Sequence, residues 1–193
     1  MVVGPTPPPE RVPAPGSLLV ASVGANDGWF TRTVVLVVDH DDSGTLGVVL
    51  NRYAEPRLTS VLPQWASLVS EPKVLFSGGP VSTNGAICLA APLGDEEPPG
   101  FRPVWGRVGL LHLDTPVEIV AGGYADLRIF AGYAGWEAGQ LARELAMDLW
   151  WVVDATYTDV FGPDPETLWQ RCLRRQGPDL AWFSTWTDDP EQN

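Results

Sequence analysis

A histidine between two carboxylates is the short motif of this chain with the clearest chemical potential. Asp39-His40-Asp41 follows an apolar run, and a histidine beside carboxylates can act as a general base or bind a metal ion. In an extended segment, however, Asp39 and Asp41 point to one side and His40 to the other. His112 is the only other histidine. The sequence therefore favours a hydrogen bond that stabilises the following turn over a catalytic or metal-binding role.

Polar residues in two neighbouring loops form a second candidate group. Asn51-Arg52 ends an apolar strand pattern, and Asp27 and Arg32 lie in an earlier loop. An arginine beside a carboxylate forms a directional, bidentate pair, so these side chains could line a pocket. A structural ion pair that fixes the loop is the favoured interpretation. The catalytic alternative places His40, Asp27 and Arg52 in one site.

Two adjacent glycines form a third candidate. Gly78 and Gly79, followed by Pro80, could present backbone N–H groups to an anion. The segment lacks the lysine and the spacing of a phosphate-binding P-loop. A tight turn that needs glycine's conformational freedom is the favoured explanation, and an anion site at Gly78 and Gly79 is the alternative.

Common signatures of a nucleophile, a metal site or a cofactor site are missing from the sequence. It has no Gly-x-Ser-x-Gly elbow. Cys88 and Cys172 lie far apart, without metal-like spacing or a histidine neighbour. We expect both to be buried free thiols, and we expect neither a metal nor a cofactor.

The charge of the chain bears on its partners. Twelve basic and 24 acidic residues give a net charge of −12. DNA is a polyanion that attracts a face rich in lysine and arginine, so the composition disfavours direct nucleic-acid binding. A local group of three arginines has acidic residues nearby: Arg171, Arg174 and Arg175. The acidity suggests basic partners.

The chain is predicted to be one domain with tails. Residues 1–15 contain six prolines and predict a disordered arm, residues 16–187 a single domain, and residues 188–193 an acidic tail. Trp182 and Trp186 either fold back onto the domain or cover a partner. The longest strongly apolar run is too short to cross a bilayer, and no secretory signal is visible. These features predict a cytoplasmic protein.

Apolar patterns and turn residues predict hairpins with interspersed helices, which indicates an α+β fold with mostly antiparallel pairing. We expect a strand at 17–21, a central hairpin of 33–39 and 45–51, a second hairpin of 73–77 and 86–90, a solvated loop at 91–103 and a strand at 105–113. Short helices are expected at 58–65 and after Asp164-Pro165, the latter with buried Leu168, Trp169, Cys172 and Leu173.

A glycine-rich stretch links the last predicted strands. Residues 130–152 predict a strand end, a sharp glycine corner, an amphipathic helix and another strand. We expect Gly135 and Gly139 to let the helix dock closely on the strands. Tyr133 and Trp136 favour core packing at this corner, with a recognition surface as the alternative.

Ordered sequence blocks extend over roughly residues 16 to 176. They are Gly16 to Ala21 with Gly44 to Arg52, then Phe76 to Val81, and finally Gly132 to Leu141 followed by Glu144-Leu145. Together they resemble the signature of the bacterial YqgE/AlgH family. Val23 and Ala25 stand where that family usually has Pro and Met, and Tyr53 replaces its Pro after Asn-Arg.

The resemblance implies a mostly antiparallel split sheet that curls into a pseudo-barrel, with a few peripheral helices. The family is largely of unknown function, and some members are labelled transcriptional regulators. The residues themselves favour a non-catalytic binding or regulatory module with a protein or small-molecule partner. One alternative is a hydrolase or transferase of unrecognised type. The second alternative, transcriptional regulation, rests on the family label.

Overall fold

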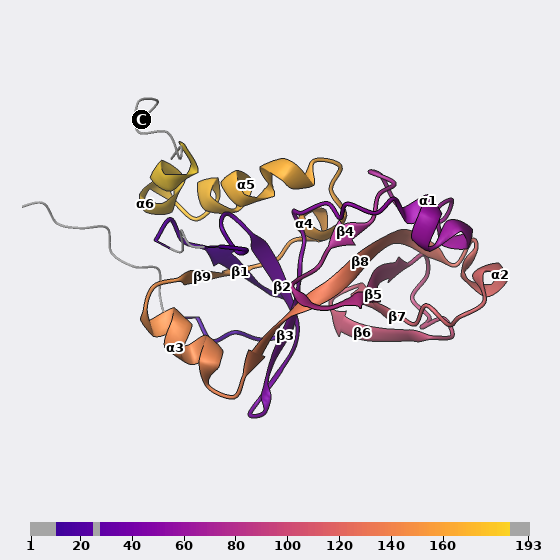
Figure 1. Cartoon of the computed structure of the whole chain (residues 1–193), viewed down its shortest axis with the longest axis horizontal. Helices are drawn as coiled ribbons and strands as arrows, with labels where there is room; N and C mark the ends of the chain where they lie inside the picture. The colour runs from indigo at the N-terminus through magenta and orange to yellow at the C-terminus, as the bar shows by residue number, and fades with distance from the viewer. Residues whose placement is uncertain (1–10, 25–27, 186–193) are drawn as a thin grey trace, which may run out of the picture.

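A hairpin of apolar, β-branched residues lies at the centre of the structure. β2 (Val34–Asp41) pairs antiparallel with β3 (Gly44–Val49) and, along its other edge, with β1 (Ser17–Ala21). Residues 34 to 38 are all buried, as expected for an unbroken apolar run in a central strand. The structure, a computed structural model, describes residues 11–24 and 28–185 (Figure 1).

One nine-stranded sheet contains all the strands of the described residues. Its order is β6-β7-β5-β8-β3-β2-β1-β9, and β4 also pairs with β8. Pairing is antiparallel except between β4 and β8. The other strands are β4 (Phe76–Ser77), β5 (Val81–Pro92), β6 (Phe101–Trp105), β7 (Val108–Leu111), β8 (Tyr124–Glu137) and β9 (Trp150–Asp154).

The long strand β8 joins the two halves of the curled sheet. Its residues 124–133 pair with β5, and its residues 134–137 pair with β3. Figure 1 shows it running through the middle of the molecule between the two sets of strands. The second half of β8 is therefore connected to both halves of the sheet.

The chain crosses β8 between β4 and β5. Phe130 and Ala131 pair with β4 on one edge and with β5 on the other, so residues 78–80 must pass from edge to edge. A Cβ on Gly79 would lie 1.9 Å from the carbonyl carbon of Tyr133. Only a residue without a side chain can pass this close to the β8 backbone.

Short helices surround the sheet. α5 covers β1 through buried Trp169, whose indole N–H donates to the carbonyl of Ala21 at 2.8 Å, while α3 lies beside β8 and β9 (Figure 1). The helices are α1 (Leu58–Val61), η1 (Pro63–Trp65), α2 (Val117–Val120), α3 (Gln140–Ala146), α4 (Tyr157–Phe161), η2 (Pro165–Thr167), α5 (Leu168–Arg174), α6 (Pro178–Ala181) and η3 (Trp182–Thr185).

The predicted fold class is confirmed: a mostly antiparallel, curled sheet with a few peripheral helices. The predicted central hairpin and first strand are also confirmed. The helix after Asp164-Pro165 buries its four predicted residues, Leu168, Trp169, Cys172 and Leu173. The helix expected at 58–65 is divided, because Pro63 begins a separate 3-10 turn.

Three expectations were wrong. The second hairpin does not form, because β4 and β5 pair with β8 on opposite edges rather than with each other. The loop expected at 91–103 contains most of β6, an edge strand that accommodates Pro103. The glycine corner predicted over Gly132 to Gly139 is strand in its first part, because residues 132–137 continue β8, and the chain turns only at its end, at Gly139, where φ is +72° at the N-terminus of α3.

The predicted tails are described in part. Residues 1–10 and 186–193, including Trp186, lie outside the described residues. Within the predicted arm, Arg11 forms an ion pair with Asp154 and Pro13 is buried. At the other end, Trp182 is 72% exposed, while Phe183 packs against Trp151 at 5.6 Å between ring centroids.

Candidate functional site

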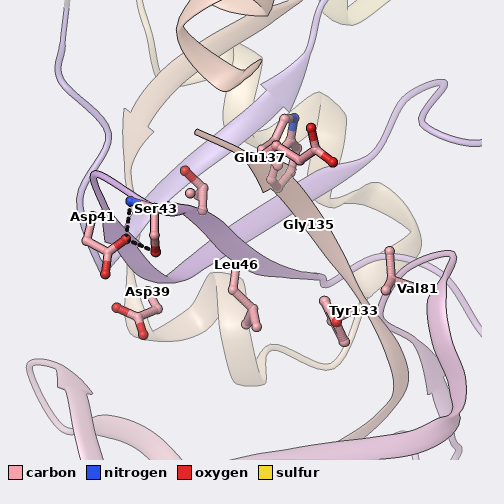
Figure 2. A pocket seen from close by; sticks show the side chains of 11 residues that line it. Asp39, Asp41, Ser43, Leu46, Val81, Tyr133, Gly135 and Glu137 are labelled. Carbon is pink, nitrogen blue, oxygen red and sulfur yellow. Dashed lines mark hydrogen bonds between the residues drawn. The ribbon is translucent and has the colours of Figure 1, made fainter. Parts of the chain in front are cut away.

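An open hollow with an acidic lining is the candidate site. It has a volume of about 530 Å³ and lies between the tip of the β2–β3 hairpin and the second half of β8. We call it the acidic hollow. It is lined by Asp39, Asp41, Ser43, Gly44, Thr45, Leu46, Val81, Tyr133, Gly135, Trp136 and Glu137 (Figure 2).

Strand register and one glycine create the hollow. Asp39 pairs with Leu46, and Leu46 pairs in turn with Gly135, so these three residues share one face of the sheet. Because alternate residues of a strand point to the same face, Tyr133 and Glu137 also lie there. Gly135 has no side chain and is exposed, so the sheet backbone itself forms part of the floor.

The electrostatics of the acidic hollow favour a cation. Among the described residues that line it, every charged side chain is a carboxylate: Asp39, Asp41 and Glu137, and all three are exposed. Ser43 donates both its hydroxyl and its N–H to Asp41, and these hydrogen bonds hold the pKa of Asp41 below its ordinary value. Asp41 therefore stays ionised across the physiological range.

The structure places His40 on the other face of the hairpin from the acidic hollow. Its Nδ1 atom lies 2.7 Å from the hydroxyl oxygen of buried Thr45. Asp39 and Asp41 both line the hollow while His40 does not, as the alternation of the extended segment predicted. The hydrogen bond joins the two strands beside the turn, which is the structural role favoured by the sequence.

His40 and Arg52 do not share a site. Asn51 Oδ1 accepts a hydrogen bond from the N–H of Val34, at the opposite end of β2 from His40. His40 lies six positions along the strand from Val34, a span of roughly 20 Å at the usual rise per residue. Arg52 donates to the carbonyl of Thr31 at 3.0 Å and lies 4.7 Å from the Trp29 ring centroid.

Asp27, the third member of that group, lies outside the described residues. The contacts of Arg52 fix the loop between β1 and β2 through a carbonyl and an aromatic ring. Asn51 joins the same loop, since its Nδ2 donates to the carbonyl of Arg32 at 2.9 Å. Asn51 and Arg52 therefore hold the loop in place, while the placement of His40 leaves the catalytic grouping without its base.

Gly78 and Gly79 are buried at the crossing of β8. Gly78 donates its N–H to the carbonyl of Ala131, and its carbonyl accepts from Val49, both at 2.8 Å. Gly78 therefore bridges β8 and β3 where the two strands separate, and its N–H is not available to an anion. The close crossing explains the glycine pair.

The expectation that the sequence lacks common nucleophile signatures, the Ser-x-x-Lys motif among them, was wrong in one respect: Ser70 and Lys73 have the spacing of that motif. The Ser70 hydroxyl donates to Asp126 at 2.6 Å and accepts from the N–H of Leu127 at 3.1 Å. The segment lies in a loop rather than at the start of a helix, and Lys73 is exposed. The contacts of Ser70 anchor this loop to β8.

Neither cysteine is an activated nucleophile. Cys88 and Cys172 are free and buried, and burial raises the pKa of each thiol to about 12. We predict that 5,5′-dithiobis(2-nitrobenzoate) labels fewer than about 0.1 thiols per native chain within an hour at pH 8, and two in guanidinium chloride. Rapid labelling of one thiol in the native protein would contradict this assignment.

The described residues show neither a metal-binding cluster nor a membrane-spanning helix. Within 11–24 and 28–185, no group of three or more His, Cys, Asp or Glu side chains is arranged to hold a metal ion. In the same part of the chain, no helix has the length and apolar character needed to cross a bilayer.

Tyr133 and Trp136 have different environments. Trp136 is only 5% exposed and belongs to the core, where its indole N–H and that of Trp150 both donate to Glu144 Oε2 at 2.8 Å. Tyr133 is half-buried and lines the acidic hollow. The core assignment is confirmed for Trp136, whereas Tyr133 packs partly against the core and partly lines the hollow, and its role in recognition stays a prediction.

Sequence reasoning missed the part of the site contributed by β8. The sequence predicts that Gly135 lets a helix dock, whereas Gly135 is exposed beside the acidic hollow, and Glu137 was given no role. The alternation of side chains along the strand did predict that Asp39 and Asp41 lie on the same side. No local signal connects them with Glu137, which pairs with Gly44 across the sheet.

Similar proteins define the family. A family model described as DUF179, AlgH-like, matches residues 18–181. A UPF0301 protein of Streptomyces avermitilis is 47% identical over 182 residues, covering 92% of this chain and 94% of its own. One of Thermobifida fusca is 44% identical over 193 residues, covering 95% of this chain and 98% of its own.

Two solved structures have the same fold. A Corynebacterium diphtheriae protein, solved by X-ray crystallography, has a TM-score of 0.84 at 29% identity, covering 91% of this chain and 94% of that one. The solution structure of the AlgH protein from Pseudomonas aeruginosa has a TM-score of 0.68 at 27% identity, covering 93% and 100%. This chain therefore belongs to the AlgH-like family, UPF0301, whose function is unknown.

Proposed function

We propose that this protein is a non-catalytic binding module whose acidic hollow receives a cationic group of its partner. The observation that carries the proposal is the lining: three carboxylates surround a hollow of about 530 Å³ with a glycine in its floor. Tyr133 adds an aromatic ring, and a cation beside a tyrosine ring gains further attraction. Because the hollow is open, the carboxylates remain hydrated and ready to pair.

The environments of the reactive side chains support binding rather than catalysis. The two thiols are buried and protonated, with their pKa raised to about 12. The ring of His40 is bonded to Thr45 and faces away from the carboxylates beside it. The acidic hollow therefore has acceptors for a cation but lacks an activated nucleophile among its described residues.

The net charge bears on the kind of partner, and the free cysteines bear on the compartment in which the protein acts. Phosphate groups would be repelled by the acidic hollow and by the net charge of −12, so we propose a partner other than nucleic acid. Free cysteines are typical of a reducing compartment, and we propose that the protein acts in the cytoplasm.

Spermidine is a suitable probe, since it is a small polycation without a peptide backbone. We expect Asp39→Asn/Asp41→Asn/Glu137→Gln to weaken spermidine binding at least tenfold, about 1.4 kcal/mol, in isothermal titration calorimetry at low salt. The matched control, Asp95→Asn/Glu96→Gln/Glu97→Gln, removes the same charge from an exposed loop. It should change the affinity less than about twofold. Equal losses in both variants would mean that binding is non-specific and would refute the proposal.

Protonation of the carboxylates at low pH should abolish spermidine binding. The lowered pKa of Asp41 means that its carboxylate is charged above about pH 4 and becomes neutral only as the pH falls further. We expect the spermidine affinity to be constant from pH 7 to pH 5 and to be lost below about pH 4. A loss of affinity already between pH 7 and pH 5 would contradict this prediction.

A further inference from the structure

The second half of β8 has an open edge. Along the edge that β5 occupies, pairing ends where Val81 meets Tyr133. Pro80 and the crossing then lead the chain away, and among the described strands none pairs with residues 134–137 on that side. The opposite edge of these residues is paired with β3. On the side where β5 lies, a short strand that continues the direction of β5 can therefore pair with this part of β8.

The backbone groups of Gly135 face this open edge. The N–H of Glu137 donates to Gln140 Oε1 at 3.0 Å rather than to β3. Successive residues of a strand direct their backbone groups to opposite edges. Glu137 and Gly135 therefore point away from β3, whereas Trp136 points toward it. Gly135 is exposed, so its N–H and carbonyl are accessible to a partner.

The open edge borders the acidic hollow. In an antiparallel pair, directly opposed residues have their side chains on the same face. A residue opposite Gly135 would therefore direct its side chain over the hollow, between Tyr133 and Glu137. Gly135 has no side chain there, and the Tyr133 ring forms one wall of this space: a Cβ on Gly135 would lie 3.4 Å from Tyr133 Cε2. Backbone pairing with Gly135 and attraction to the carboxylates of the hollow therefore act on the same residue of a partner.

We propose that the partner is an extended peptide segment that adds to β8 antiparallel, as a continuation of β5, with a lysine or arginine opposite Gly135. This proposal rests on the proposed function and specifies its ligand. Charge complementarity identifies the occupant, because Glu137 lies at the edge itself and Asp39 and Asp41, on β2, line the far side of the same hollow. Strand addition supplies main-chain hydrogen bonds for affinity, while the side-chain site supplies specificity.

Backbone-methylated peptides test the pairing without altering the protein. The probe is Ac-Thr-Val-Lys-Val-Thr-NH2, titrated against the full chain by calorimetry and by the Gly135 amide signal in NMR spectra. N-methylation of the lysine nitrogen removes the N–H that would donate to the Gly135 carbonyl. N-methylation of the following valine is the matched control, because that N–H points away from β8. Replacing lysine by glutamate tests the charge.

We expect lysine N-methylation to weaken binding about tenfold, valine N-methylation less than about twofold, and the glutamate peptide to bind at least tenfold more weakly. Equal effects of the two methyl groups would overturn strand addition. Binding of spermidine without binding of the peptide would overturn this inference and leave the proposed function standing. Failure of both probes would refute both.

A second copy of the chain is the competing occupant of the edge. If the Gly135 signal shifts with protein concentration, sedimentation shows a dimer and the lysine peptide does not compete, the edge is a self-association site. That result would also overturn the proposal.

Discussion

Replacing Arg128 by methionine is expected to lower the free energy of unfolding by about 3–4 kcal/mol. Arg128 is a β8 residue that is 1% exposed. Its guanidinium donates to the carbonyls of Val160, Glu71 and Gly162 at 2.6 to 2.9 Å and lies 4.7 Å from the ring centroid of Phe76. Burial lowers its pKa to about 10, so it remains charged at neutral pH.

Two separate segments, the end of α4 and the loop before β4, are joined to β8 by this one side chain. Methionine keeps much of the volume but leaves the carbonyl of Gly162, at the end of α4, and that of Glu71, in the loop before β4, without their donor. Unsatisfied buried acceptors cost roughly 1–3 kcal/mol each. Arg128→Lys should recover part of the loss, because one ammonium cannot reproduce the planar fork of donors.

Denaturant unfolding monitored by circular dichroism measures the effect. The matched control is Arg102→Met, the same change at an exposed position of β6, for which we expect a change within about 0.5 kcal/mol. Similar losses in the two variants would show that Arg128 does not hold these segments together.

Replacing Glu144 by alanine is expected to cost about 2–4 kcal/mol. Its Oε2 atom accepts the indole N–H groups of Trp136 and Trp150, both 5% exposed, and its Oε1 accepts from Gln140. The ring centroids of the two tryptophans lie 5.8 Å apart in an edge arrangement. Removal of the carboxylate leaves two nearly buried donors unpaired and frees α3 from the sheet.

Two further variants make this prediction specific. Glu144→Gln should lose only about 1 kcal/mol, because the amide oxygen can still accept both indole groups. Glu55→Ala removes an exposed glutamate and should stay within about 0.5 kcal/mol. The indole signals of Trp136 and Trp150 should move in NMR spectra of Glu144→Ala. Unchanged signals and stability would contradict the assigned role of Glu144.

The sequence predicted those elements whose signals are local. The β-branched run at 34–38 and the turn at Ser43-Gly44 specify a central hairpin without reference to the rest of the chain. The helix after Asp164-Pro165 is likewise specified by its first turn and by one apolar face. Alternation along β2 was sufficient to separate His40 from Asp39 and Asp41.

Glycines whose roles depend on distant residues could not be interpreted from sequence. Gly132 suggested a corner, but its φ of +67° lies within β8, where a Cβ would approach the carbonyls of Gly79 and Val81. The crossing of β8 therefore explains this glycine, and nothing local indicates the crossing. Edge strand β6 was missed because Pro103 resembled a loop residue, although an edge position tolerates proline.

The acidic hollow also depends on residues that are distant in the sequence. Asp39, Gly135 and Glu137 are brought together by the register of β2, β3 and β8, which a single sequence does not reveal. Buried Arg128 was also unexpected, because arginines are mostly exposed. Its neighbours in sequence are apolar on both sides, Leu127 and Ile129, and this was the available signal of burial.

The acidic hollow is proposed to bind cations. The most direct measurement is a titration of the ¹⁵N-labelled protein with spermidine, followed by amide chemical shifts. We expect the largest shifts at Gly44, Gly135 and Glu137, with saturation at one site, and no comparable shifts at the exposed acidic loop Asp95–Glu97. Shifts of equal size at that loop, or none at Gly44 and Gly135, would contradict the claim.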